Sequence, residues 1–172
     1  MPMAPRTRKL ALTAHVSTSV GWLGAVAASV GLAVVAMVSN DAQTVRGVYV
    51  AMEPLAWFIL VPLSAASLLT GLVQSLGTPW GLVRHYWVVL KLIINLFASV
   101  ILLMYTQTLG NLAADARDPA MVTTDDLRSA SPLVHAAGAM VLLVLAVVLS
   151  IYKPRGLTRF GRARRSAGIA VE

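Results

Sequence analysis

The sequence predicts an all-α fold: a bundle of four transmembrane helices with both termini in the cytoplasm. Three observations support this prediction. The composition is 58% hydrophobic and only 12% charged, which is more apolar than a soluble domain of 172 residues accommodates. Four apolar stretches reach the roughly 20 residues that a helix needs to cross a hydrocarbon core. Basic residues also gather on one side of these stretches.

The apolar stretches divide the chain into three parts. We expect a basic cytoplasmic N-terminus at residues 1–9, a four-helix membrane domain at 10–152 and a basic cytoplasmic tail at 153–172. The four helices are expected at about 10–38, 42–75, 85–109 and 132–152.

The first stretch has one competing interpretation, a cleaved signal peptide. Arg6 to Lys9 resembles a basic n-region, and Ala25 with Ala27 resembles a small-residue cleavage site. The apolar run nevertheless continues to Val38, beyond the length of a signal h-region. We therefore expect a retained helix.

Polar residues between the stretches predict where the helices begin. Asp41 is expected to cap the second helix. The third helix is expected to end near Leu109, so that residues 110–132 form a long external connection. Ser131 followed by Pro132 predicts a cap with proline at the first helical position of the fourth helix.

The distribution of basic residues predicts the orientation. Only Arg46, Arg117 and Arg128 lie on one side of the predicted membrane domain. The other side has Arg6, Arg8, Lys9, Arg84, Lys153, Arg155, Arg159, Arg162, Arg164 and Arg165. Cytoplasmic loops retain Lys and Arg, so this second side is expected in the cytoplasm of a bacterial cell, with the protein in its inner membrane.

The expected partner is the lipid bilayer, and a second copy of the chain or another membrane subunit is the further alternative. The net charge of +7 comes largely from the tail and the N-terminus. We do not expect a nucleic-acid partner, because no aromatic interleaving or recognition motif accompanies these charges.

Two groups of polar residues within the helices are the candidate sites, since ionisable groups in hydrocarbon usually face the bundle interior or water. His15 and Lys91 are expected to converge near the cytoplasmic leaflet, with His85 at the boundary. Trp22 and Asn95 are expected to surround this cofactor-binding site. Neutral imidazole is a ligand of haem iron, so haem b is the cofactor that this hypothesis names.

Glu53 and His135 form the second group, near the external leaflet, and are candidate metal ligands. Each begins an inward-running helix, so we expect both to face the bundle at similar depth. The chain has no cysteine, so any metal needs His, Met or carboxylate ligands. For both groups, packing or snorkelling to the interface is the alternative interpretation.

Several motifs occur in a suggestive order. The chain has His15, then Gly21-Trp22-Leu23-Gly24, Met52-Glu53-Pro54-Leu55, Pro62, Gly71, Gly77-Thr78-Pro79-Trp80-Gly81, Trp87 and Lys91. This order resembles an uncharacterised actinobacterial family of four-helix integral membrane proteins. It is also similar, more distantly, to protoporphyrinogen oxidases of the HemJ type and to the copper-resistance D family.

The resemblance to the HemJ type implies that His15 and Lys91 match haem-associated positions and that Glu53 matches a Met-Glu pair. The chain has Leu32 to Val38 where that family places an Arg and a second His. Three functions therefore stay open: haem binding for a redox or haem-handling role, a metal-ion or small-molecule permease component, and a non-catalytic assembly or scaffold subunit. Whether the protein is an enzyme is left open with them.

Overall fold

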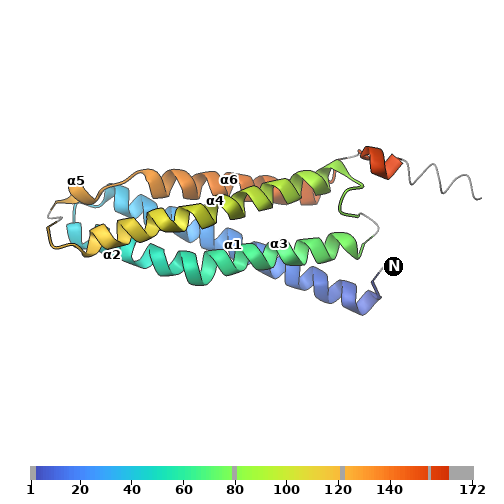
Figure 1. Cartoon of the computed structure of the whole chain (residues 1–172), viewed down its shortest axis with the longest axis horizontal. Coiled ribbons are helices and arrows are strands. Elements are labelled where there is room, and N and C mark those ends of the chain that lie inside the picture. The colour runs from blue at the N-terminus through green and yellow to red at the C-terminus, as the bar shows by residue number, and fades with distance from the viewer. Residues whose placement is uncertain (1–2, 79–80, 121–122, 155, 163–172) are drawn as a thin grey trace, which may run out of the picture.

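The computed structural model describes residues 3–78, 81–120, 123–154 and 156–162, and every regular element in these ranges is a helix. The long helices lie side by side (Figure 1). In chain order the elements are α1 (Pro5–Val38), α2 (Ala42–Leu55), the π-helix η1 (Ala56–Leu60), α3 (Val61–Leu76), α4 (Tyr86–Arg117), α5 (Thr124–Leu127) and α6 (Ser131–Tyr152).

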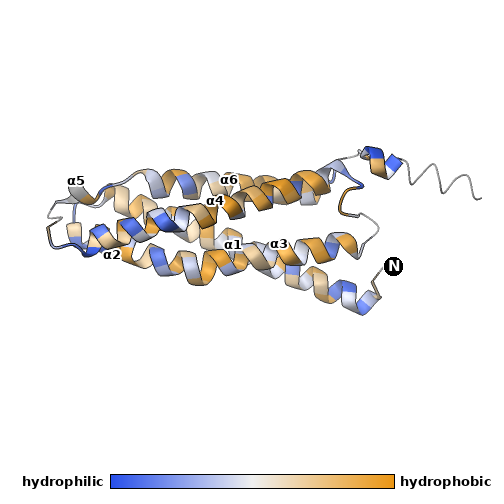
Figure 2. Cartoon of the chain, viewed as in Figure 1, coloured by the Kyte–Doolittle hydropathy of each residue, from blue (hydrophilic) through white to orange (hydrophobic). Residues whose placement is uncertain are grey.

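Four helices in the described residues are long and apolar enough to cross a membrane: α1, the continuous helix Ala42–Leu76, α4 and α6. Their middle sections are the most hydrophobic parts of the molecule (Figure 2). The predicted all-α bundle of four membrane helices is thereby confirmed.

The two ends of the bundle differ in what they contain. The N-terminus lies at the same end as the segment after α6 and the connection from α3 to α4 (Figure 1). We call this the terminal end. The opposite end, which we call the loop end, contains the connection at 39–41 and the segment around α5.

The second membrane helix changes its hydrogen-bonding pattern in the middle. Pro54 lies within α2 and Pro62 lies in the first turn of α3. Neither proline has an N–H group to donate to the preceding turn. Between them η1 forms a π turn, in which the Val61 N–H donates to the Ala56 carbonyl five residues earlier.

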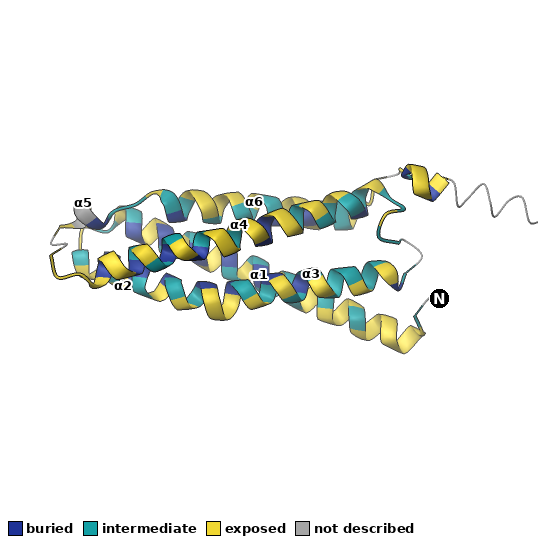
Figure 3. Ribbon diagram, viewed as in Figure 1, coloured by how far each residue is buried: buried dark blue, intermediate teal, exposed yellow. Residues whose placement is uncertain are grey.

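The four membrane helices pack in a ring. Helix α1 contacts α3 and α6, α2 contacts α4, and α4 also contacts α6. The outward faces of the helices are exposed (Figure 3), although they are apolar. In the most apolar stretch of α6 only 11% of the residues are buried, so this helix needs lipid as its solvent.

Two helices are longer than the sequence predicted. Helix α1 begins at Pro5, before the apolar run starts, with proline in its first turn. Helix α4 continues past Leu109 to Arg117, so residues 110–117 belong to a helix and not to the connection. The apolar run ends at Leu109, but Ala113 and Ala116 are buried and favour helix.

One of the two predicted caps is confirmed. The Asp41 carboxylate accepts hydrogen bonds from the N–H groups of Gln43 and Thr44 at the start of α2. The prediction for Ser131 is wrong by one position, because Ala130 is the N-cap and Ser131 is already helical. The Ser131 hydroxyl instead accepts a hydrogen bond from Tyr105 of α4.

Candidate functional site

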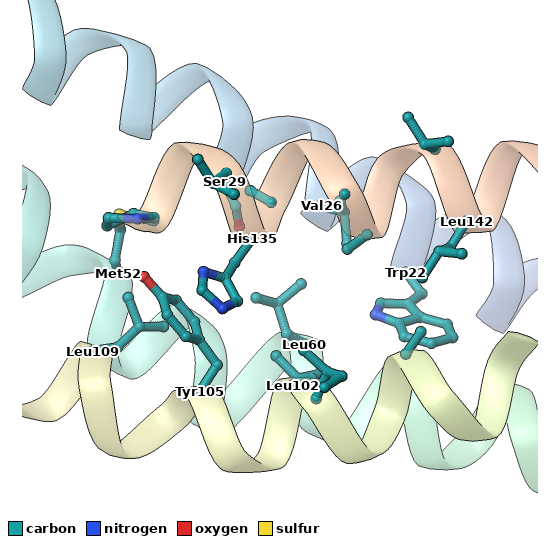
Figure 4. Close-up of a pocket in the computed structure, with 18 of the residues that line it drawn as sticks. Trp22, Val26, Ser29, Met52, Leu60, Leu102, Tyr105, Leu109, His135 and Leu142 are labelled. Carbon is teal, nitrogen blue, oxygen red and sulfur yellow. The ribbon is translucent and has the colours of Figure 1, made fainter. Parts of the chain in front are cut away.

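A cavity of about 510 Å³ lies between α1, the second membrane helix, α4 and α6. Its polar lining residues are Ser29, Tyr105 and His135 (Figure 4). The other lining residues are hydrophobic or glycine: Trp22, Val26, Met52, Leu60, Phe97, Ala98, Ile101, Leu102, Leu109, Pro132, Val134, Ala136, Gly138, Ala139, Val141 and Leu142.

The cavity reaches the outer surface of the bundle. Trp22 and Met52 form its deep side and are almost fully buried. Phe97 of α4 and Val134 of α6, which also line it, have 55% and 65% of their surfaces exposed. The cavity is therefore open on the side of the bundle where α4 and α6 are exposed.

A polar group of three residues lies at the loop end of the cavity. The Tyr105 hydroxyl donates to Ser131 Oγ at 3.0 Å. The rings of Tyr105 and His135 are stacked, with centroids 3.9 Å apart and planes inclined by 16°. His135 Nδ1 lies 2.9 Å from the Ser131 carbonyl oxygen and 3.4 Å from Ser131 Oγ. The imidazole is therefore held on its edge and on one face.

The contact between His135 Nδ1 and the Ser131 carbonyl determines which hydrogen bonds the imidazole can form with a ligand. A carbonyl oxygen only accepts hydrogen bonds, so His135 Nδ1 carries the hydrogen and donates it. In the neutral imidazole Nε2 then presents a lone pair. Figure 4 shows the ring extending from α6 toward the cavity, and no described residue gives Nε2 a hydrogen bond.

Contacts at the loop end fix the start of α6. Arg128 donates to the Ser39 carbonyl at the end of α1 at 2.8 Å. The Ser129 N–H donates to the Tyr49 hydroxyl of α2 at 3.0 Å. Ser131 and His135 follow directly, so these contacts with other helices help to hold the polar end of the cavity in place.

His15, the first predicted haem ligand, lies in the contact between α1 and α3. Its Nδ1 is 3.2 Å from the Thr70 hydroxyl, and Thr18 lies 3.3 Å from the same hydroxyl. One turn further along, Ser19 and Ser67 are joined at 2.8 Å. His15 thus belongs to a row of polar contacts between two helices.

Lys91, the second predicted ligand, reaches a different helix. Its ammonium donates to Ser150 Oγ of α6 at 2.9 Å. Asn95, expected beside the haem, donates to the Lys91 carbonyl one turn earlier in α4. Lys91 and His15 thus have different hydrogen-bonding partners, Ser150 of α6 and Thr70 of α3.

His85 lies at the terminal end, where it is the N-cap of α4. Its backbone pairs with that of Leu157 in the segment after α6. Its ring centroid is 6.4 Å from that of Trp87. Trp22, in contrast, lines the cavity from α1.

Glu53 and His135 both lie in the half of the bundle nearer the loop end, but each has its own partner. Glu53 forms an ion pair with Arg117 of α4 at 2.8 Å. His135 contacts Ser131 and Tyr105 instead. No group of three or more His, Cys, Asp or Glu residues that could hold a metal ion occurs in the described residues.

Comparison of the chain with family models, with curated proteins and with solved structures finds no match. The resemblance drawn from the motifs therefore stays a prediction.

The sequence analysis did not single out Tyr105, Ser131 or Met52 as site residues. The spacing of Ser131 and His135 is a signal that could have been used, because residues four apart share one face of a helix. Tyr105 and Met52 have no such signal, since only the packing of α4 against both α2 and α6 brings them to the same cavity.

Proposed function

We propose that this multi-pass membrane protein binds an apolar small molecule, taken from the bilayer, in the cavity between α1, α4 and α6. The observation that carries the proposal is a membrane-facing cavity of about 510 Å³ with apolar walls and one polar group at its end. Ligand sites are typically apolar with a few well-placed polar groups that fix orientation.

The same proposal includes the location. The excess of Lys and Arg at the terminal end favours a cytoplasmic position for both termini and insertion in a bacterial inner membrane. The polar end of the cavity would then lie toward the outer leaflet.

Native mass spectrometry tests the binding proposal, with a substitution at Gly138 that is designed to fill the cavity. Gly138 lines the cavity, and a Cβ atom added there meets nothing within 4 Å. The substitution Gly138→Phe should therefore place a ring in the cavity without a clash at Cβ. Ala137→Phe is the matched control, because Ala137 is the adjacent exposed residue and is not part of the lining.

The wild-type protein and Ala137→Phe should retain an apolar adduct after gentle release from detergent, and Gly138→Phe should lose most of it. Extraction with organic solvent then identifies the molecule. Equal adduct occupancy in all three proteins, or no adduct even after exposure to membrane lipid extract, would contradict binding in this cavity and favour the scaffold alternative.

Haem b is a second candidate, favoured by the orientation of His135. An imidazole whose Nδ1–H donates to a backbone carbonyl keeps the Nε2 lone pair for a metal, so His135 would be able to bind haem iron. Met52, whose thioether is also a haem ligand type, lines the same cavity. Bound haem would supply one-electron chemistry, while His135 and Met52 would hold the iron within apolar walls.

The haem candidate has a spectroscopic test. Protein from haem-replete cells should show a Soret band that is lost in His135→Ala and kept in His15→Ala. A Soret band that depends on His15 and not on His135 would place the haem site at His15 and Lys91, as the sequence analysis predicts. Absence of a band in the wild-type protein would exclude haem as the bound molecule.

A further inference from the structure

We infer that the ligand of this cavity is an amphiphile with a single hydroxyl head, such as an isoprenoid alcohol, whose hydroxyl donates a hydrogen bond to His135 Nε2. This inference rests on the proposed function and names the ligand's chemistry. It follows from three features: the direction of the hydrogen bond at Nδ1, the stacked tyrosine, and the shape of the cavity.

The hydrogen bond at Nδ1 sets the chemistry of the head. Because Nδ1–H donates to the Ser131 carbonyl, Nε2 of the neutral ring can only accept. A ligand group that only accepts, such as an ether or an ester, has nothing to donate to it. A hydroxyl has a hydrogen to donate, and a hydrogen bond is stronger in a low-dielectric environment such as the membrane interior than in water.

Tyr105 limits the approach to the ring. Its own hydroxyl is directed to Ser131 Oγ at 3.0 Å, and its ring covers one face of the imidazole. The nitrogen edge of His135 is therefore the part of this polar group that remains for a ligand. Because His135 Nε2 is a single acceptor, it can bind a single hydroxyl group.

The cavity continues from this point along the helix axes. Its α6 lining runs from Pro132 to Leu142, and the ten residue steps between them correspond to about 15 Å of helix at 1.5 Å per residue. Trp22 and Leu142 line the part away from His135 (Figure 4). A polar head at His135 thus leaves room for an apolar chain that extends toward the middle of the bilayer.

The residues around His135 also argue against a phospholipid head group in this position. The labelled lining residues at the His135 end are Met52, Leu109, Tyr105 and Ser29, none of which is charged (Figure 4). A phosphate there would have no Lys or Arg partner in the lining, and burying an unpaired charge is costly. A neutral hydroxyl carries no such penalty.

The test compares farnesol with farnesyl methyl ether, which share the same chain and differ in the hydroxyl hydrogen. Delipidated protein is incubated with each compound, and the bound fraction is measured by native mass spectrometry. A net hydrogen bond of about 0.5–1.5 kcal/mol corresponds to roughly a 2- to 12-fold preference for the alcohol. In His135→Phe both compounds should bind equally.

The controls separate the two proposals. His85→Phe, which removes an imidazole at the opposite end, should keep the preference for the alcohol. If neither compound binds, the proposed function fails. If both bind the wild-type protein equally, or if His135→Phe keeps the preference, apolar binding stands and the hydroxyl inference is overturned.

Discussion

Single side chains in the contact between α1 and α3 determine how closely these helices approach. Gly71 faces the His15 ring, and a Cβ atom at Gly71 would lie 3.1 Å from His15 Cε1. The adjacent Thr70 hydroxyl holds the same ring by its Nδ1. Small residues allow membrane helices to approach, and polar side chains then join them.

Enlarging Gly71 should separate the two helices. We expect Gly71→Val to destabilise the protein by about 1–3 kcal/mol through overpacking. Gly24→Val is the control, because a Cβ atom at Gly24 meets nothing within 4 Å. Thermal unfolding in detergent should show a lower midpoint for Gly71→Val than for Gly24→Val. Equal unfolding midpoints for the two variants would show that the His15 ring can move aside without loss of stability.

The Asp41 carboxylate, at the start of α2, gives a pH-dependent prediction. Hydrogen bonds from the Thr44 hydroxyl, and then from the N–H groups of Thr44 and Gln43, hold the pKa of this carboxyl below its ordinary value of 3.8. A lowered folded-state pKa stabilises the fold above the unfolded-state pKa, and this contribution is lost as the pH falls through the folded-state pKa.

Asp41→Ala should therefore lower the unfolding temperature at pH 7, and the difference from wild type should shrink as the pH falls below about 3.8. Asp41→Asn keeps a capping oxygen without the charge, and it should lose less at pH 7. A difference that stays constant over this pH range would argue against the charged cap.

Among the elements, the segment after α6 docks on the connection that leads into α4. Thr158 is buried, and its hydroxyl donates to the Val83 carbonyl. Its N–H donates to the Arg84 carbonyl at 3.0 Å, and its hydroxyl oxygen accepts from the Gly161 N–H at 3.3 Å. Two segments far apart in sequence are thus joined at the terminal end.

Removing this hydroxyl should loosen the docked segment. In Thr158→Val the Val83 carbonyl and the Gly161 N–H lose their partner, whereas Thr158→Ser keeps it. Hydrogen exchange at Gly161 should be faster in Thr158→Val than in the wild type or Thr158→Ser, as expected when a local contact opens more often. Identical exchange in all three proteins would show that the hydroxyl does not hold the segment.

For the whole molecule, the arrangement of the four membrane helices places both described ends of the chain at the terminal end. The loop end has Asp41, Asp118 and Asp125, while the basic residues gather at the terminal end. From the positive-inside rule we therefore expect the loop end to face the outside of the cell.

Because the chain has no cysteine, single cysteines can test this orientation directly. In intact cells an impermeant thiol reagent should label Asp125→Cys and should not label Thr78→Cys or Phe160→Cys. After the membrane is opened all three should react. Labelling of Thr78→Cys or Phe160→Cys in intact cells would reverse the topology.

The sequence alone determined the class and the number of membrane helices, because both depend on long apolar runs that need lipid as solvent. It also determined the cap at Asp41, since a capping contact involves only neighbouring residues. It did not determine the end of α4, where alanines continue the helix after the apolar run stops.

Only the tertiary structure decided which polar residues meet. His15 and Lys91 lie at comparable depth by sequence, yet His15 bonds to Thr70 of α3 and Lys91 to Ser150 of α6. Depth follows from position along a helix, whereas a partner depends on the rotation of each helix in the ring. For the same physical reason the cavity at Tyr105 and His135 could not be read from the chain, because it exists only where α1, α4 and α6 pack together.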